Sequence, residues 1–470
     1  MTASKTLENR SRSQAPPVAL SPEAWLVVGG FALVVALLGG SSRPDAFQIA
    51  ILRPAAALFL IPALWHLRLE AVREAAVPAI LLGLLAAWMA LQLVPLPPSL
   101  WHSLPERAVV AEIDELLGDP DRWRPLSLVP SRTINALASL VVPISALLLA
   151  LAYRMAGFHL LILLAGAGVF DAVLGLGQVL TGLSSVLYFY EVTNRGSPVG
   201  ILANENHAAV LSALTLLVIA RLAIRTPTHG APTWIRLASA PAYGTVLLAI
   251  LVSGSRAGLS LAALALIVTA LMVWSTSRQG KESDRRMRET YVPVRSPRLF
   301  LWAFVAAIAL TIAAFVLLER TPAFEDIFAR NAFEDLRARI WPTLAEMMST
   351  FWVLGSGFGS FEEVYHIFEP TALLLPSYVN QAHNDWAQLV IEGGVPALAL
   401  LVILLGWIVT TVARMGKADG SSTMLALFWM AILAILAAAS IVDYPLRTPI
   451  FQALGVWLLV VLAQDRRAQK

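Results

Sequence analysis

The chain has 470 residues, of which 58% are hydrophobic and only 14% are charged, and its mean hydropathy is +0.71. Soluble domains carry about 25% charged residues, so this composition excludes a soluble enzyme, a secreted disulfide scaffold and a nucleic-acid-binding protein. The formal net charge of +3 indicates no polyanionic partner. Because the chain has no cysteine, disulfides, thiolate metal sites and thiol nucleophiles are excluded too.

The charged residues lie between apolar stretches that are long enough to cross about 30 Å of hydrocarbon as helices. The polar N-terminus, residues 1–23, precedes the first stretch without a signal-peptide cleavage site, so we expect that stretch to be retained. We predict an all-α polytopic membrane protein of about twelve transmembrane helices. The expected spans are 24–40, 44–64, 75–94, 133–152, 155–181, 200–220, 239–255, 257–274, 299–318, 394–413, 422–440 and 449–464.

The distribution of Lys and Arg predicts the orientation of these spans. With the N-terminus inside, twenty-one of the 34 cations fall in inner segments, twelve in outer segments, and Arg53 within a span. The positive-inside rule then places both termini, including residues 465–470, in the cytoplasm. Two outer loops are long, 95–132 and 319–393.

The 319–393 loop, between the ninth span of the 24–318 block and the tenth of the 394–464 block, is predicted to be folded and helical. It carries apolar residues at helical spacing from Arg337 to Met348, and three glycines, Gly355, Gly357 and Gly359, that predict a turn. The sequence around these glycines resembles a phosphate-binding loop, but no strand precedes it.

A second helix is predicted in this loop from the sequence QAHNDWAQLVIEGG. Asn384 or Asp385 is a suitable N-cap, an apolar stripe follows at Trp386, Leu389 and Val390, and Gly393 is a natural stop. His383 then lies at the mouth of the helix. Either it is a surface histidine beside the cap, or it accepts a proton in a reaction.

Arginines are the second group of candidate site residues. Arg337 and Arg339 lie in the large loop, and Arg256 lies in the turn Ser253–Gly258 between two spans. Such arginines can simply reach phospholipid headgroups. Guanidinium groups also bind phosphate oxygens in a bidentate manner, which suits a membrane diphosphate as substrate.

Two further polar clusters lie at predicted span ends. Asn204, Asn206 and His207 open the sixth span, where free backbone N–H groups favour an anion or a hydroxyl-rich ligand; the alternative is polar contact between helices. Asp443 and Arg447 follow the eleventh span, and the simplest interpretation is a local ion pair between them.

Two further interactions are considered, an ion pair within the membrane and a metal site. Arg53 and Asp171 lie nearer the middle of the membrane and could pair with each other. A divalent metal could in principle be held by His383 and Asp385 with Glu362, Glu363 and His366, but their spacing is not that of a compact metal site. We therefore predict no metal and no cofactor.

Taken in order, these motifs resemble the bacterial O-antigen ligase and O-antigen polymerase superfamily over about residues 200–449. The resemblance is carried by six segments: Asn204–His207, Ser253–Gly258, Arg339–Pro342, Leu354–Gly357, Ala382–Asp385 and Glu392–Gly394. It implies a bacterial inner-membrane glycosyltransferase that needs neither metal nor nucleotide sugar. Such an enzyme takes a glycan from an undecaprenyl diphosphate carrier at the periplasmic face, so the 319–393 loop would be periplasmic.

The resemblance implies that Arg256 and Arg339 grip the diphosphate and that His383 acts at the acceptor. Substrate-binding roles are expected for Arg337, Asn204, Asn206, His207, Asn384, Asp385 and Arg447. The expected partners are the donor lipid, an acceptor that is lipid A-core or another glycan, and membrane lipids, with no nucleic acid.

Three functions are compared. A ligase transfers the glycan to lipid A-core, whereas a polymerase joins carrier-linked repeat units, and the two share these motifs. A flippase of lipid-linked sugars needs a polar path that reaches both faces. The polar clusters here, apart from Arg53 and Asp171, gather on the outer face, which favours an enzyme over a flippase. We expect a ligase, with an O-antigen or exopolysaccharide polymerase as the alternative.

Overall fold

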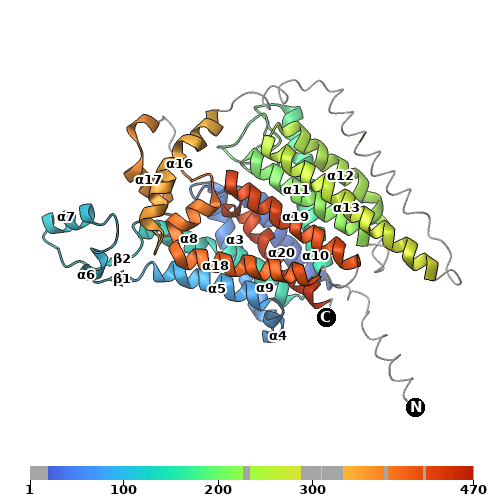
Figure 1. Ribbon diagram of the computed structural model, residues 1–470, viewed down its shortest axis with the longest axis horizontal. Helices are drawn as coiled ribbons and strands as arrows, with labels where there is room; N and C mark the ends of the chain where they lie inside the picture. The colour runs from blue at the N-terminus through green and yellow to red at the C-terminus, as the bar shows by residue number, and fades with distance from the viewer. Residues whose placement is uncertain are drawn as a thin grey trace, which may run out of the picture.

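The computed structural model describes residues 20–225, 233–286, 332–374, 379–415 and 420–468, together with residue 309. Within these ranges the chain is almost entirely helical (Figure 1). The only strands in them, β1 (Pro95–Leu96) and β2 (Arg124–Pro125), pair antiparallel at the base of a small excursion. The helices are α2 (Pro22–Leu38), α3 (Phe47–His66), α4 (Leu69–Val72), η2 (Arg73–Ala75), α5 (Ala76–Leu91), α6 (Pro98–Trp101), α7 (Ala108–Leu116), α8 (Pro130–Ser139), α9 (Val141–Ala152), α10 (Gly157–Thr181), α11 (Glu205–Arg225), α12 (Thr233–Ser253), α13 (Arg256–Arg286), α16 (Ala332–Phe351), α17 (Phe361–Phe368), η4 (Thr371–Leu373), α18 (Asp385–Met415), α19 (Gly420–Val442), η5 (Pro445–Arg447) and α20 (Pro449–Arg467).

The described helices form a multi-pass membrane bundle. Eight of them are long and apolar enough to cross a membrane, and α2 and the apolar part of α12 are shorter. Every predicted span other than 299–318 coincides with a helix. That range is not described apart from residue 309, so the total of about twelve spans and the length of the large loop stay predictions.

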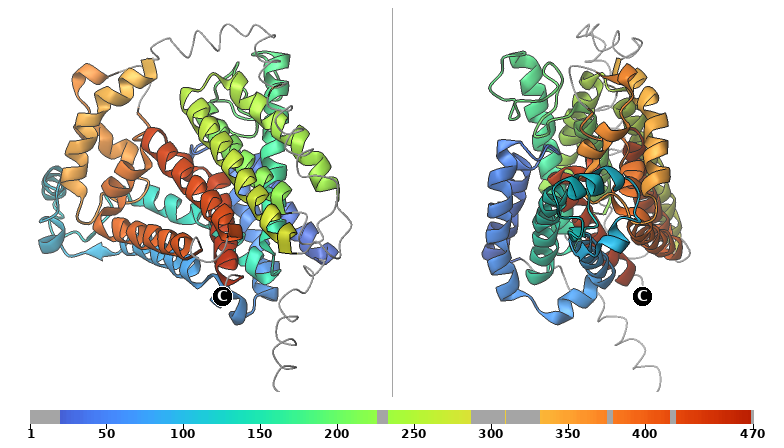
Figure 2. Two further views of the ribbon diagram at one scale, coloured as in Figure 1. Left: turned by 45° about the vertical axis from the view of Figure 1, so that its right-hand side comes forward. Right: turned by 90° about the vertical axis from the view of Figure 1, so that its left-hand side faces the viewer.

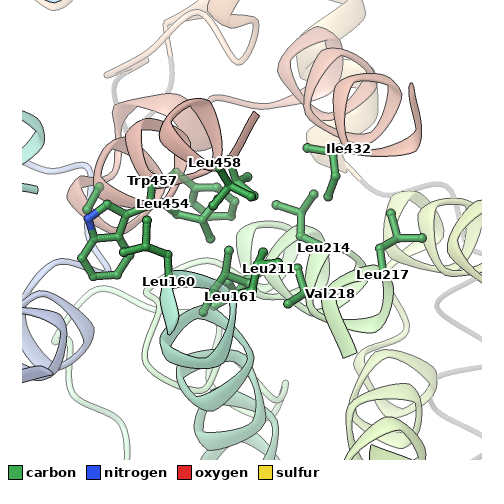
Figure 3. Packing of buried hydrophobic residues seen from close by; sticks show 14 of the residues in the cluster. Leu160, Leu161, Leu211, Leu214, Leu217, Val218, Ile432, Leu454, Trp457 and Leu458 are labelled. Atoms are coloured by element: carbon green, nitrogen blue, oxygen red, sulfur yellow. The ribbon is translucent and has the colours of Figure 1, made fainter. Parts of the chain in front are cut away.

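Helix α11 lies at the centre of the bundle. Its apolar window is 94% buried, whereas the windows of the other candidate spans are 17% to 50% buried. Figure 3 shows Leu211 and Leu214 of α11 between Leu160 of α10, Leu454 of α20 and Ile432 of α19. A helix that is apolar on all sides belongs in the interior, and the surrounding helices turn their exposed apolar side chains toward lipid.

Small residues allow the neighbouring helices to approach α11 closely. A Cβ atom at Gly168 of α10 would lie 1.8 Å from Thr215 Oγ1, and one at Gly258 of α13 would lie 2.6 Å from Ala209 Cβ. Close contact between small residues is a usual way for membrane helices to pack, because burial of apolar surface drives little association in lipid. The contact at Gly258 holds the start of α13, directly after its turn from α12, against the start of α11.

The described part of the large loop is folded, as predicted. Helices α16 and α17 share a small apolar core with α18, formed by residues such as Ile340, Phe361 and Ile391. They lie at the same end of the molecule as α6 and α7 (Figures 1 and 2). The predicted turn between α16 and α17 is confirmed, because Gly355, Gly357 and Gly359 all have positive φ angles, of 79°, 110° and 82°.

The predicted helix end at Gly393 is confirmed to within one residue. The range of α18 extends to Met415, but it joins two helical parts across a kink at Gly394, where the backbone is not helical: φ is 61° and ψ is −160°. The carbonyl groups released by the kink are bonded by α5 and its C-cap: Trp88 Nε1 donates to Gly393 O at 2.8 Å, and Gln92 Nε2 donates to Glu392 O at 2.9 Å. Buried backbone groups need such partners, so α5 stabilises the kink.

The buried face of α18 also differs from the predicted stripe. Ala387, Gln388, Ile391 and Glu392 are buried, whereas Trp386, Leu389 and Val390 are only half-buried. Trp386 and Leu389 line a cavity, described below. The N-cap prediction is confirmed for Asn384, whose Oδ1 accepts the Ala387 N–H at 2.9 Å.

Candidate active site

Four of the polar residues singled out in the sequence lie around one buried carboxylate, Asp443. Asp443 follows the last residue of α19 and is 2% exposed. Its Oδ1 lies 3.5 Å from His383 Nδ1 and 3.7 Å from His207 Nε2. Its Oδ2 accepts Asn206 Nδ2 at 3.1 Å and Asn204 Nδ2 at 3.5 Å. These five residues are referred to as the Asp443 cluster.

His383 is held in an uncommon backbone conformation. Its φ angle is 50°, in the left-handed region that non-glycine residues rarely adopt and that costs about 1–3 kcal/mol. The next residue fixes it, because Asn384 caps α18 and donates from Nδ2 to the Ile441 carbonyl of α19 at 3.0 Å. Backbone strain of this kind is characteristic of functional positions.

Aromatic contacts hold the two imidazoles beside the carboxylate. The Tyr444 ring lies edge-on between them, with ring centroids 4.9 Å from His383 and 5.2 Å from His207. His207 is 1% exposed, while the side chain of His383 is 19% exposed. His383 is therefore the imidazole that a substrate can reach.

The start of α11 is arranged differently from the predicted anion site. The Glu205 and Asn206 N–H groups donate to the side chains of Asn194 and Asn204, at 3.2 Å and 2.8 Å. These backbone donors are therefore occupied, and the Asn204 and Asn206 amides turn to Asp443 instead. The asparagines orient a carboxylate rather than offer a free helix end to a ligand.

The charge of Asp443 is stabilised by its neighbours. Burial alone would raise the pKa of Asp443, but the attraction of His207 and His383 outweighs burial and holds it well below its usual range. Among the described residues, His383 Nδ1 and both ring nitrogens of His207 have no hydrogen-bond partner. Buried polar atoms without partners are uncommon, and catalytic hydrogen bonds are often long before substrate binds.

Arg447 does not pair with Asp443, so the predicted local ion pair is wrong. Arg447 instead contacts two acidic residues of α18, with its Nη2 3.0 Å from Glu392 Oε2 and its Nε 3.7 Å from Asp385 Oδ1. Asp385 Oδ2 also accepts Ser440 Oγ at 3.0 Å and the Leu446 N–H at 3.2 Å. This second group ties α18 to the segment that follows Asp443.

Arg256 adjoins the Asp443 cluster through its neighbour in sequence. Ser255 Oγ accepts the Gly258 N–H at 3.0 Å, which caps α13, and donates to Asn206 Oδ1 at 2.9 Å. Arg256, the first residue of α13, is half-buried at this junction.

The two arginines predicted in the large loop, Arg339 and Arg337, are not joined to the Asp443 cluster by any described contact. Arg339 is exposed on α16, and its Nη2 donates to Ala372 O at 3.3 Å. Nothing in the described contacts joins it to the Asp443 cluster. Arg337 also lies in α16, but its side chain is not among those described.

A cavity of about 470 Å³ adjoins the second acidic group. Asp385, Glu392 and Arg447 line its polar end. Arg53 also lines it and donates to Asn135 Oδ1, whereas Asp171 accepts the Ile201 N–H at 2.8 Å on the other side of the bundle. The suggested pairing of Arg53 with Asp171 is therefore wrong.

The residues considered as metal ligands, His383 and Asp385 with Glu362, Glu363 and His366, do not form one site in the described structure. Glu362 and Glu363 pair with Arg132, at 3.7 Å for Glu362, and His366 Nδ1 lies 3.1 Å from Glu369. In the part of the chain that the structure describes, no group of three histidine or acidic side chains could hold a metal ion.

The sequence analysis did not predict three roles that the structure indicates: Asp443 as the centre of a cluster, Glu392 as a partner of Arg447, and Ser255 as the link to Asn206. The sequence signal was a polar residue at the end of an apolar stretch. Asp443 directly follows such a stretch and Ser255 precedes one, but the sequence does not show which residue of another helix each of them contacts.

A comparison with protein-family models finds one match, over part of the chain. Residues 241–402 match the family model described as O-antigen ligase, a stretch that contains Arg256, Arg339 and His383. No curated protein matches the chain. This match supports the O-antigen ligase and polymerase superfamily, and the long apolar helices indicate a multi-pass membrane protein.

Proposed function

We propose that the protein is an inner-membrane glycosyltransferase of the O-antigen ligase type. It would move a glycan from an undecaprenyl diphosphate carrier to lipid A-core at the periplasmic face, with both termini in the cytoplasm. The observation that carries this proposal is the Asp443 cluster, which presents a partly exposed histidine against a buried carboxylate. No metal and no nucleotide cofactor enters the proposal.

We assign the proton transfer of this reaction to His383. Its Nδ1 faces Asp443, so Nε2 is left to accept the proton of the attacking sugar hydroxyl. As the oxygen–carbon bond to the acceptor forms, the bond between the sugar and the diphosphate breaks. Asp443 then stabilises the imidazolium, as a carboxylate does in other histidine-based sites.

The leaving diphosphate gains negative charge in this step. We assign its stabilisation to Arg256 and Arg339, and a binding role to Arg337, because guanidinium groups bind phosphate oxygens in a bidentate manner. Arg256 adjoins the cluster through Ser255 and Asn206, which supports its assignment. In Arg339, the exposed guanidinium is available to a ligand.

The test is transfer by the purified full chain in nanodiscs, with a carrier-linked glycan as donor and lipid A-core as acceptor. A ligase yields glycan on the core. Elongated glycan on the carrier would instead identify a polymerase, the runner-up. Translocation in sealed vesicles without any new glycosidic bond would identify a flippase and refute the proposal.

In cells, deletion of the gene separates the same possibilities. Loss of all polymer from the core with polymer retained on the carrier is expected for a ligase. Cores capped with one repeat would indicate a polymerase. Wild-type core glycans in the deletion strain would contradict both assignments.

A further inference from the structure

Two buried polar side chains of helix α10 hold an irregular segment of backbone, residues 198–203. Asp171 and Gln178 are 2% and 0% exposed. They are seven residues apart, which places them about two turns from each other on one face of the helix. The segment directly precedes Asn204 of the Asp443 cluster. The side chains of Asp171 and Gln178 are referred to as the α10 pair.

The α10 pair bonds the backbone of this segment on both its donor and its acceptor groups. The Ile201 N–H donates to Asp171 Oδ1 at 2.8 Å, and the Gly200 N–H donates to Gln178 Oε1 at 2.8 Å. Gln178 Nε2 donates to Gly200 O at 2.8 Å and to Leu187 O at 2.9 Å. Non-helical backbone inside a membrane bundle needs such partners, so the α10 pair fixes where the segment lies.

The segment lies directly on α10 because glycines remove the side chains between them. A Cβ atom at Gly175 of α10 would lie 3.0 Å from Pro198 Cβ. A Cβ atom at Gly200, where φ is 59°, would lie 2.1 Å from Asp171 Oδ1. A displacement of the α10 pair is therefore passed on to the segment.

The far end of the segment leads into the Asp443 cluster. The Ala203 N–H donates to Gly40 O at 3.0 Å, which fixes the last residue before Asn204. Asn204 Oδ1 accepts the Asn206 N–H at 2.8 Å, and both asparagine amides donate to Asp443 Oδ2, at 3.5 Å and 3.1 Å. The position of the segment therefore determines where the two amides meet the carboxylate.

We propose that Asp171 and Gln178 are positioning residues for glycan transfer. They act through the segment 198–203, which places Asn204 and Asn206 and, through them, the buried carboxylate beside His383. The proposal rests on the proposed function. Both residues precede the stretch 241–402 that matches the family model, so α10 contributes to the site from another part of the chain.

The geometry favours a hydrogen-bonding role for Asp171 over a role that depends on its charge. An ionisable residue within a span commonly marks a path for protons or ions. Asp171, however, bonds a backbone N–H, and the adjacent residue of the same segment is bonded by the uncharged Gln178. Replacement of the carboxylate by an amide separates the two roles, because it keeps the acceptor oxygen and removes the charge.

Kinetics of glycan transfer by the purified full chain in nanodiscs test the proposal. We expect Gln178→Leu and Asp171→Leu to lower kcat by about 10- to 100-fold, the cost of a small displacement of reacting groups. The KM for the carrier-linked donor should stay within about twofold, because neither side chain binds substrate. Normal kcat in the folded leucine variants would overturn the proposal and leave the proposed function intact, and a raised KM with normal kcat would also overturn it.

The matched control is Gln464→Leu. Gln464 of α20 is half-buried, and its Nε2 donates to Met155 O at 2.9 Å, beside the opposite end of α10. The control removes the same kind of bond, from a glutamine amide to a backbone carbonyl, away from the Asp443 cluster. It should leave kcat and KM unchanged.

A double-mutant cycle tests whether Gln178 acts through Asn206. Gln178→Leu combined with Asn206→Ala should be no slower than the slower single variant, because residues that act through one another are not additive. Rate losses that multiply in the double variant would show that the two residues act independently and would overturn the proposal.

Asp171→Asn provides a variant that remains measurable where the leucine variants fail to fold. Because asparagine keeps an acceptor for the Ile201 N–H, it should restore kcat to within about threefold of the unmodified value, the scale of one weakened hydrogen bond. A loss as large as that in Asp171→Leu, or a loss of more than about tenfold by itself, would show that the charge is required and would overturn the assigned role.

Hydrogen exchange separates failure of this proposal from failure of the proposed function, because it needs no catalysis. The Glu205 and Asn206 N–H groups are bonded by the side chains of Asn194 and Asn204. We expect Gln178→Leu to speed their exchange by about tenfold or more, and Gln464→Leu to leave it unchanged. Unchanged exchange in Gln178→Leu would overturn the proposal even in a chain that transfers glycan. Faster exchange in a chain that transfers no glycan to any acceptor would support the link from α10 to the asparagines and refute the proposed function.

Discussion

Replacement of Asp443 by Asn is the sharpest test of the proposed chemistry, because it keeps the shape of the side chain and removes its charge. At 3.5 Å from His383 Nδ1, a carboxylate and an imidazolium attract each other by about 5 kcal/mol at an effective dielectric constant of about 20. If the imidazolium forms in the transition state, the loss of this attraction corresponds to about 10³ to 10⁴ in rate. We expect Asp443→Asn to reduce kcat by that factor.

A double-mutant cycle separates this role from simple packing. His383→Ala should lose about 10² to 10⁴ in rate, the usual contribution of a general base. Residues that act as one unit are not additive, so the double variant with Asp443→Asn should be no slower than the worse single variant. Asp119→Asn, an exposed substitution in the 95–132 excursion, is the control and should be fully active.

The stability of the same variants gives a second readout. Because the folded pKa of Asp443 lies below its unfolded value of about 3.9, its charge stabilises the fold above about pH 4. This contribution is lost as the pH falls through the lowered folded pKa. The difference in Tm between the unmodified chain and Asp443→Asn should therefore shrink in acid.

Two results would refute the reasoning about Asp443. Normal turnover in a folded Asp443→Asn variant would show that its charge does not serve the reaction. Rate losses that multiply in the double variant would show that His383 and Asp443 act independently.

Three further predictions concern other parts of the chain. Arg256→Ala and Arg339→Ala should abolish transfer in correctly inserted protein, with partial rescue by Lys, which lacks the bidentate fork; full activity in both Ala variants would remove them from the site. Gly394→Ala should cost about 2–3 kcal/mol in the free energy of unfolding, because φ is 61° and a Cβ would lie 2.6 Å from Val353 O; Gly406→Ala, which meets open space, should not destabilise the protein. Reporter fusions after Ser277 should indicate cytoplasm and fusions within 325–375 periplasm, and a cytoplasmic signal from the latter would overturn the orientation.

Local features were predictable from sequence because their causes are local. Apolar length located the spans, the short polar side chain of Asn384 indicated its cap, and three closely spaced glycines indicated the turn before α17. The glycines Gly393 and Gly394 indicated a helix end, and the first helical part of α18 ends there. The partners of the released carbonyl groups, Trp88 and Gln92, could not be predicted because they come from a distant part of the chain.

Partners across helices could not be predicted, since one sequence gives no distance between spans. Asp443 has a cation four residues away in Arg447, and a local pair was the simplest interpretation. The fold instead turns Asp443 toward α11 and the start of α18, and offers Glu392 to Arg447. Helix packing determines which residues become the partners of Asp443. Packing buries Asp443 beside His207, and a buried carboxylate must have polar partners.

The Asp443 cluster is built from helix ends, and this has a consequence for how two lipid-linked substrates could meet. His383 precedes α18, Asp443 follows α19, and Asn206 and His207 lie in the first turn of α11. Helix ends of a membrane bundle lie where hydrocarbon gives way to polar headgroups, so a lipid can keep its chain between helices while its sugar reaches the cluster. Capping and interhelical hydrogen bonds hold these ends in place, which pre-organises the charged groups before substrate binds. The strain at His383 is therefore maintained by the packing of α18 on α19, and loss of the Asn384 tether should reduce turnover more than it reduces carrier binding.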